Sequence, residues 1–97
     1  MTNSDLISII TPFKNSSEFL SDCLESIINQ SYLNWELIII DDYSNDNSFQ
    51  LVHSISLKDK RIKLFKNAGE KGIINCLRQA LNKCSGDYIT RMDSDDV

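Results

Sequence analysis

The sequence contains no apolar run approaching the roughly 20 residues that a membrane-spanning helix requires, which excludes such a helix within it. Its first residues, Met1 to Asp5, also lack the basic stretch and the long apolar core of a secretory signal. We therefore expect a cytoplasmic chain. Any association with a membrane would come through a C-terminal region beyond residue 97.

Basic side chains are in the minority, because 10 Lys and Arg residues face 14 Asp and Glu residues and the net charge is −4 at pH 7. This balance argues against nucleic acid as a partner, since domains that bind it present a basic patch. An acidic protein would also repel a phosphate ligand unless a divalent cation lay between carboxylates and phosphates. A phosphate-containing ligand is therefore expected to bring Mg²⁺ or Mn²⁺.

Cysteine and histidine are too few and too scattered for a metal centre of the zinc type. Cys23, Cys76 and Cys84 have no metal-ligand spacing, and each occupies an apolar position of a predicted helix, so we expect small core side chains. Their odd number fits a reducing compartment better than a disulfide framework. His53, the single histidine, lies in a predicted helix away from the expected site, which argues against a role as general base.

The 97 residues suffice for one small domain, with 41% hydrophobic and 25% charged residues as in ordinary globular proteins. Apolar patterning alternates between short strand-like runs and longer helical periods. Strands are predicted at residues 6–10, 35–40, 61–65 and 87–92. The first is expected to stop at Thr11 and Pro12, and the second, which is the most apolar, to be the most central.

Three helices are predicted between these strands. The first starts at Ser16 or Ser17, and its apolar residues form one stripe: Phe19, Leu20, Cys23, Leu24, Ile27 and Ile28. The second follows the polar residues 45–48. The third precedes Gly86, which suits a C-terminal cap, and its apolar residues are Ile73, Ile74, Cys76, Leu77, Ala80, Leu81 and Cys84.

This β-α-β-α-β-α-β order predicts the α/β class: a Rossmann-like three-layer parallel sheet with helices on both faces. Right-handed crossovers give the strand order 3-2-1-4, with a switch point between the first and fourth strands. Ligands of open α/β sheets bind at the carboxyl ends of the strands beside such a point. The order would bring three stretches of the chain to one cleft: Thr11-Pro12-Phe13, Asp41-Asp42 and Asp93-Ser94-Asp95.

Two of the predicted strands run directly into acidic residues. After the fourth strand, Asp93 and Asp95 have the spacing that lets one carboxylate hold a divalent ion while the other holds a ribose hydroxyl or a bridging water. The alternative is a solvated acidic loop. After the second strand, side chains alternate, so only one of Asp41 and Asp42 should face the cleft. The alternative there is a turn closed with Ser44 and Asn45.

Four stretches of the chain together resemble the N-terminal half of family 2 glycosyltransferases, which are inverting enzymes of the GT-A fold that use nucleotide-sugar donors. The matching stretches are residues 7–15, 24–32, 35–48 and 85–96. They follow the family's order and span nearly the whole chain. Against the family's usual pattern, Phe13 stands in place of Tyr, Tyr43 in place of Gly, and Arg78 in place of Asn.

The resemblance assigns roles to individual residues. Thr11 and Phe13 would line the nucleotide-base pocket, with Pro12 fixing the turn, and Asp42 would bind uracil or a related base. Asp93 would contact the ribose, and Asp95 would coordinate the Mn²⁺ or Mg²⁺ that bridges the diphosphate. Lys71 would lie near the donor, although an exposed lysine at a helix start is an equally good interpretation.

The resemblance also implies the reaction. A sugar would pass with inversion from a nucleoside-diphosphate donor, most commonly a UDP-sugar, to a hydroxyl of a glycan or lipid-linked acceptor in bacterial polysaccharide biosynthesis. The family's general base follows the Asp-x-Asp motif. We therefore expect residues 1–97 to be the nucleotide-binding part of a longer domain, truncated after that motif. Such a part would bind nucleotide without turnover and would self-associate through its open edge.

Two other functions remain open from the residues alone. One is a non-catalytic nucleotide- or metal-binding module on the same fold. The other is a phosphorylatable receiver-like domain, which also places acidic residues at strand ends. A receiver requires its acidic pair after the first strand, where this chain has Thr11 and Pro12.

Overall fold

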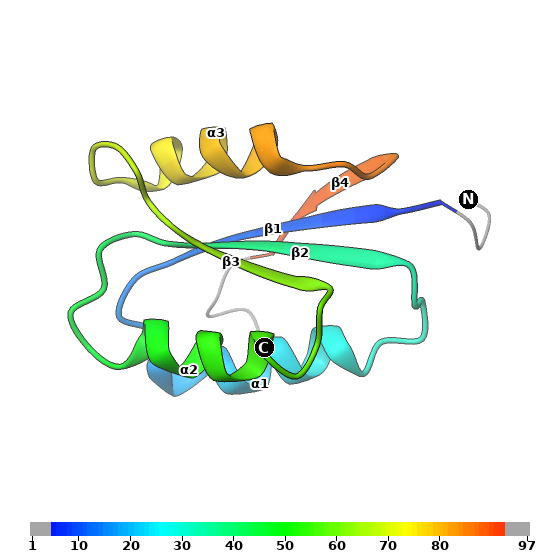
Figure 1. The fold of residues 1–97 in the computed structure, drawn as a ribbon, viewed down its shortest axis with the longest axis horizontal. Helices are drawn as coiled ribbons and strands as arrows, with labels where there is room; N and C mark the ends of the chain where they lie inside the picture. The colour runs from blue at the N-terminus through cyan, green and yellow to red at the C-terminus, as the bar shows by residue number, and fades with distance from the viewer. Residues whose placement is uncertain (1–4, 93–97) are drawn as a thin grey trace.

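The computed structural model describes residues 5–92, which form a four-stranded parallel sheet in the order β3-β2-β1-β4 (Figure 1). The predicted class and strand order are therefore confirmed. The elements follow one another as β1 (Ile7–Phe13), α1 (Ser17–Ile28), β2 (Trp35–Asp41), α2 (Ser48–Ser56), β3 (Ile62–Lys66), α3 (Ile73–Lys83) and β4 (Tyr88–Arg91).

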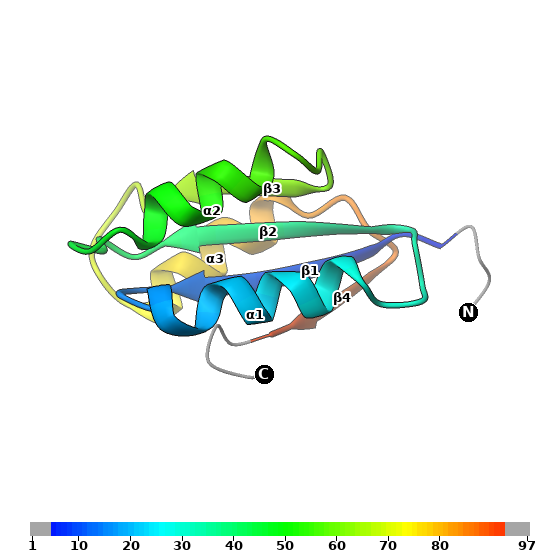
Figure 2. The ribbon, with the colours of Figure 1, turned by 90° about the horizontal axis from the view of Figure 1, so that it is seen from below.

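Helices cover both faces of the sheet, which makes the three layers that the sequence predicted. Helices α1 and α2 lie side by side on one face, and α3 lies alone on the other (Figures 1 and 2). Each face has its own apolar cluster. The larger one, beneath α1 and α2, includes Ile9, Phe13, Leu20 and Leu37, and the smaller one, beneath α3, includes Ile10, Ile38, Ile40 and Cys76.

Strand β2 is the centre of the molecule, because all seven of its residues are buried. Its run of Leu and Ile suits a strand that is covered on both faces. Neighbouring β1 is buried from Ser8 onward and pairs with β2 along its whole length, from Ile7 with Trp35 to Phe13 with Asp41. These two strands therefore end side by side, at Phe13 and Asp41.

Strand β1 continues through Pro12, so the prediction that it stops at residue 10 is wrong. Even-numbered residues of β1 bond toward β4 and odd-numbered ones toward β2: Met92 N–H donates to the Ile10 carbonyl (3.0 Å), and Asp42 N–H to the Phe13 carbonyl (2.8 Å). The nitrogen of Pro12 therefore faces the β4 side, beyond the last β1–β4 pair of the described residues. Its missing N–H costs no bond to β2, and the strand continues.

Helices α1 and α2 start where the polar residues predicted them, but the buried stripes of α1 and α3 are narrower than the predicted apolar stripes. In α1 the residues Leu20, Cys23, Leu24 and Ile27 are buried, whereas Phe19 is 43% exposed. In α3 only Cys76 and Ala80 are buried, and its end residues Ile73, Ile74 and Leu81 are exposed. The three cysteines are free, and Cys23 and Cys76 are buried, as expected of small core side chains.

Gly86 does not cap α3, which ends at Lys83 with Cys84 as its cap residue. The glycine is required instead by a close approach to β1. A Cβ at this position would lie 2.6 Å from Ser8 Oγ, 2.7 Å from Ser8 N and 2.8 Å from the Leu6 carbonyl oxygen. Only a residue without a side chain lets the chain enter β4 here.

Strand β4 is the least covered part of the sheet. All four of its residues are exposed, including half of the surfaces of Tyr88 and Ile89. It pairs with β1 on one side and leaves its other side open within the described residues. None of the described helices has the length and apolar character needed to cross a membrane.

Candidate functional site

The candidate site lies at the carboxyl edge of the sheet, where β1, β2 and β3 end at Phe13, Asp41 and Lys66. Helices α1 and α2 follow β1 and β2 on one face, and α3 follows β3 on the other (Figure 1). The chain therefore switches direction between β1 and β4, and Asp42 lies one strand from that switch point. This is the edge at which open α/β sheets bind ligands.

The two carboxylates at the end of β2 have different partners. Asp41 Oδ1 accepts the backbone N–H of Ser44 (3.0 Å), closing the turn that the sequence analysis gave as the alternative for this pair. Asp42 lies among residues of the loop before α3 and of α3 itself. The expected alternation is thus present, and only Asp42 is available on the α3 face.

Asp42 is buried, with 6% of its surface exposed, and is held by donors from the segment before α3. The backbone N–H of Gly72 donates to both carboxylate oxygens (3.0 Å to Oδ1 and 3.1 Å to Oδ2). The side-chain amide of Asn67 donates to Oδ1 (3.0 Å). Because Gly72 is the cap residue of α3, the carboxylate lies at the positive end of that helix.

These contacts determine the charge of the site. Burial by itself raises the pKa of Asp42, but the Gly72 N–H, the Asn67 amide, the Cys76 thiol and the charge of Lys14 outweigh it, and the pKa is lowered. Asp42 is therefore ionised, and an acceptor only, at neutral pH. Burial and the neighbouring Asp42 charge raise the pKa of Cys76 to about 11, so its thiol stays protonated.

A second layer of hydrogen bonds fixes Asn67. Its Oδ1 accepts from Gln79 Nε2 (2.6 Å) and from the Gly69 N–H (2.8 Å), and its Nδ2 donates to the Glu70 carbonyl (2.8 Å) as well as to Asp42. Gln79, from α3, accepts the Ala68 N–H through Oε1 (3.0 Å). The loop between β3 and α3 is thereby wrapped around the Asp42 carboxylate.

The loops after β1 and β2 are also joined at this edge. Asn15 N–H donates to Ser44 Oγ (2.9 Å), and Asn45 N–H donates back to Asn15 Oδ1 (2.9 Å). Tyr43, between them, has a φ of +60°, a backbone conformation that favours glycine. Its hydroxyl donates to the Gly69 carbonyl and connects this turn to the loop before α3.

The structure does not bring all the predicted residues to the same face. Phe13 belongs to the cluster beneath α1 and α2, and Thr11 shares its face by strand alternation, so both side chains point away from the α3 face that holds Asp42. Both are buried, and Thr11 Oγ1 has no hydrogen-bond partner among residues 5–92. That these side chains and Asp42 line one base pocket stays a prediction.

Two other predicted residues do lie with Asp42. Pro12 is buried, pairs with Ile40 and shares the α3 face by alternation. Lys71 precedes Gly72 and is exposed, with its Nζ 5.8 Å from the centre of the Tyr43 ring. Asp93 and Asp95 lie outside the described residues. Within residues 5–92 no three metal-ligating side chains gather into a possible metal site.

Sequence reasoning missed the residues that hold Asp42. The sequence patterns assigned no role at the site to Asn67 or Gln79. Gln79 carries no sequence signal, because its contact spans 12 residues between a loop and a helix. A better signal existed for Asn67, since an amide before a glycine at the end of a strand commonly bonds its own backbone.

The amino ends of the strands carry a different cluster, centred on the buried Glu36. Its carboxylate accepts from Ser8 Oγ (2.6 Å), Lys63 Nζ (2.8 Å) and the Ser85 N–H (2.7 Å). Ser8 Oγ in turn accepts the Gly86 N–H (2.8 Å). These donors engage both carboxylate oxygens, so this cluster joins β1, β2, β3 and the entry to β4.

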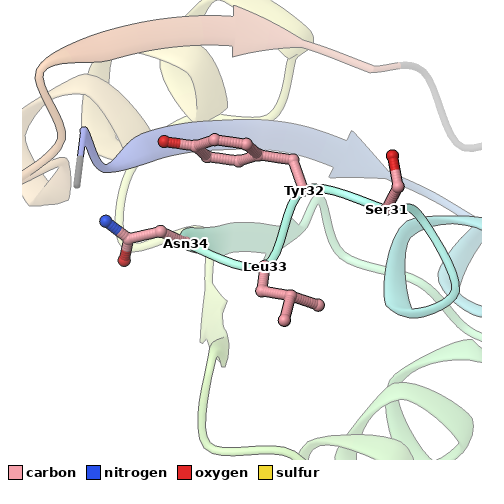
Figure 3. A pocket seen from close by; sticks show the side chains of 4 residues that line it. All are labelled: Ser31, Tyr32, Leu33 and Asn34. Carbon is pink, nitrogen blue, oxygen red and sulfur yellow. The ribbon is translucent and has the colours of Figure 1, made fainter. Parts of the chain in front are cut away.

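A hollow of about 480 Å³ also lies at this end, lined by Ser31, Tyr32, Leu33 and Asn34 of the loop before β2 (Figure 3). The Tyr32 hydroxyl donates to the Asp5 carbonyl along its side, and Leu33 is largely exposed. It is at the opposite end of β2 from Asp42. Its lining includes no carboxylate or amine, so this hollow is not the site that the acidic residues at the strand ends predicted.

A parallel α/β sheet in the order 3-2-1-4, with an ionised carboxylate at its carboxyl edge, defines an open α/β domain of the kind that binds ligands at that edge. Comparison with known proteins identifies the family to which the chain belongs. Residues 8–97 match the family described as Glycosyl transferase family 2, and the chain belongs to this family.

Two bacterial relatives illustrate the match. An uncharacterised glycosyltransferase of Haemophilus influenzae is 47% identical over 94 residues, which cover 97% of this chain and 38% of that protein. The Escherichia coli protein WfgD, a UDP-Glc:alpha-D-GlcNAc-diphosphoundecaprenol beta-1,3-glucosyltransferase, is 40% identical over 92 residues, or 95% of this chain and 36% of that protein. The chain thus spans somewhat over a third of each.

Solved structures show the same fold, that of the GT-A glycosyltransferases. The mannosyltransferase PcManGT from Pyrobaculum calidifontis, in complex with GDP-Man and Mn²⁺, aligns with a TM-score of 0.84 at 22% identity, covering 92% of this chain and 27% of that one. Residues 1–349 of S. aureus TarS in complex with UDP-GlcNAc align with a TM-score of 0.78 at 25% identity, covering 92% of this chain and 26% of that one.

Proposed function

We propose that this chain is the nucleotide-binding part of an inverting glycosyltransferase that takes its sugar from a nucleoside-diphosphate donor, most commonly a UDP-sugar. The observation that carries the proposal is the buried, ionised carboxylate of Asp42 at the carboxyl edge of the sheet. Family membership and the nucleotide sugars bound by PcManGT and TarS support it.

Asp42 would recognise the base. A carboxylate has about four acceptor positions. Three of them are taken by donors from the protein: the Asn67 amide, the Gly72 N–H and the Cys76 thiol. One position is left for a donor from a ligand. Uracil offers the N–H at its position 3, and a charge-assisted bond of this kind is among the stronger hydrogen bonds. Thr11 and Phe13 would contribute to the base pocket only through their backbone atoms at the end of β1. Pro12 would fix the conformation of that backbone.

The diphosphate would be held by a divalent cation and a lysine. Asp95 is the proposed ligand of Mn²⁺ or Mg²⁺, Asp93 the proposed ribose contact and Lys71 the proposed cation beside the donor. Oxygen donors suit both metals. When bound, the metal would supply electrostatic stabilisation of the charge on the leaving diphosphate. The Mn²⁺ of PcManGT is consistent with this choice, although that likeness is one of fold.

The acceptor would be a glycan or a lipid-linked sugar in bacterial polysaccharide biosynthesis. Support comes from WfgD, whose name specifies a diphosphoundecaprenol acceptor. Such an acceptor would bring a cytoplasmic enzyme to the membrane surface. The general base that inversion requires is proposed to follow the Asp-x-Asp motif, so residues 1–97 would bind donor without transferring sugar. The open edge of β4 would let this part self-associate, which sedimentation of the 97-residue chain would detect.

Titration calorimetry with UDP and with GDP, each with and without Mn²⁺, tests the proposal in the full-length protein. We expect metal-dependent binding of one nucleotide that is lost in Asp95→Ala and kept in Asp22→Ala, a matched control on the exposed side of α1. Binding that needs no metal, or that survives in Asp95→Ala, would contradict the proposal. A non-catalytic module would bind in the same way but transfer no sugar from any donor.

A further inference from the structure

We propose that Asn67 and Gln79 are positioning residues that set the nucleobase selectivity of Asp42. The inference rests on the proposed function, because it requires that Asp42 receive a donor from the base. Neither residue needs to touch the ligand. Each would act through the orientation of the Asp42 carboxylate.

The three side chains form one directed chain of hydrogen bonds that starts at the backbone. The Ala68 N–H donates to Gln79 Oε1 (3.0 Å), so Gln79 Nε2 must face Asn67. That amide donates to Asn67 Oδ1 (2.6 Å), which also accepts the Gly69 N–H (2.8 Å). Donors therefore surround the Asn67 oxygen, and its nitrogen must face Asp42.

The Asn67 amide has no freedom to turn over. Its nitrogen donates to two acceptors, Asp42 Oδ1 (3.0 Å) and the Glu70 carbonyl (2.8 Å), and its oxygen accepts from two donors. All four of its hydrogen-bonding positions are thus used, and a flipped amide would place donor against donor. The amide is buried, which makes such a mismatch costly.

This arrangement determines which carboxylate oxygen a ligand meets. Asp42 Oδ1 receives both the Asn67 amide and the Gly72 N–H, each at 3.0 Å, and the Gly72 N–H is shared with Oδ2 at 3.1 Å. The Cys76 thiol is the third donor to the carboxylate, so with Oδ1 occupied by two donors one position is left on Oδ2. An oxygen with two lone pairs and two donors is saturated. A base must therefore approach Oδ2, and must bring an N–H to it.

The expected consequence is discrimination between pyrimidine bases. Uracil presents an N–H at position 3, whereas cytosine presents an acceptor nitrogen there, which the ionised carboxylate repels. If Asn67 no longer held the carboxylate, Asp42 could rotate and meet other edges of a base. Affinity for UDP would then fall, and affinity for CDP would fall less or rise.

The experiment measures dissociation constants for UDP and CDP in the presence of Mn²⁺, in the full-length protein. In the variants Gln79→Leu and Asn67→Asp, we expect the ratio of the CDP to the UDP constant to fall by about tenfold, the equivalent of one hydrogen bond. Matched controls are Gln50→Leu on α2 and Asn82→Asp on α3, both exposed, which should leave the ratio unchanged.

The ratio separates positioning from mere support of the fold. If both constants rise equally in Gln79→Leu and Asn67→Asp, or if both variants unfold, the residues are structural and the inference is overturned. Failure of the proposed function is recognised differently. It would appear as an equal affinity of the unsubstituted protein for UDP and CDP, or as unchanged UDP binding in Asp42→Asn.

Discussion

Asp41 and Asp42 are adjacent, and both are buried, with 5% and 6% of their surfaces exposed, yet they have different hydrogen-bond partners. Strand alternation sends their side chains to opposite faces of the sheet. Asp41 closes a turn through Ser44, and Asp42 receives donors from Gly72 and Asn67. The position of each carboxylate along the strand thus determines which donors it meets.

The two residues should respond differently to the same substitution. Asp41→Asn keeps the oxygen that accepts the Ser44 N–H, so we expect a loss of less than about 1 kcal/mol in the free energy of unfolding. Asp42→Asn places an amide nitrogen against one of two donors, from Gly72 or Asn67, and should cost about 1–3 kcal/mol. Urea unfolding of both variants measures this, and equal losses would contradict the assignment.

At this scale the sequence predicted part of the site. The acidic pair could be recognised because it follows the most apolar strand, and alternation said that only one of the two would be available. The choice of Asp42 came from the family resemblance. The faces of Thr11 and Phe13 could not be assigned, because the pattern ended β1 before them. Gln79 was invisible, since its partner lies in a loop whose path depends on the packing of α3.

Among the elements, β4 depends most on contacts with the rest of the fold. Its residues are exposed, so burial contributes little to its position. The approach of Gly86 to Ser8 and the bond from the Ser85 N–H to Glu36 (2.7 Å) fix the point at which the chain enters the strand. That entry sets the register in which β4 pairs with β1.

Gly86→Ala tests this dependence. The added methyl group would lie 2.7 Å from the Ser8 nitrogen and 2.8 Å from the Leu6 carbonyl oxygen, backbone atoms that cannot move without disturbing the sheet, so we expect a loss of about 1–3 kcal/mol in stability. Gly69→Ala is the matched control, because its Cβ would lie 3.8 Å from its nearest neighbours. Thermal unfolding of both variants compares them. A Gly86→Ala protein as stable as the control would show that β4 tolerates a shifted entry.

The elements themselves were largely readable from the sequence. Runs of Leu and Ile at β2 and the spaced apolar residues of α1 are strong local signals, and their alternation leaves few topologies. The end of β1 was missed because Pro12 normally ends a strand, and only the bonding direction of its neighbours shows why it does not. The reason for Gly86 was equally hidden, because it lies in the distance to Ser8.

Across the whole molecule, Glu36 joins more elements than any other polar residue described above. Burial raises its pKa, but hydrogen bonds from Lys63, Ser8 and Ser85 outweigh burial and lower the pKa to about 2. The folded-state pKa is therefore below the unfolded value of about 4.5. Such a group stabilises the fold fully above the unfolded pKa, and this contribution is lost as the pH falls through the folded one.

We therefore expect acid sensitivity that depends on Glu36. Between pH 4.5 and about 2 the unsubstituted protein should lose on the order of 2–3 kcal/mol more stability than Glu36→Gln, allowing for the partial exposure of Lys63. Glu25→Gln, at an exposed position of α1, should follow the unsubstituted protein. Urea unfolding at a series of pH values measures the difference. Parallel curves for Glu36→Gln and the unsubstituted protein would contradict the pKa assignment.

The central claim is that a nucleotide binds at the carboxyl edge of the sheet, against Asp42. Amide chemical shifts recorded by NMR during addition of UDP and Mg²⁺ test it most directly. The account predicts shifts at Asp42 and Gly72 and in the Asn67 side-chain amide, with Ser8 and Gly86 at the opposite end unchanged. Shifts confined to the amino ends of the strands, or no shifts at millimolar UDP, would contradict it.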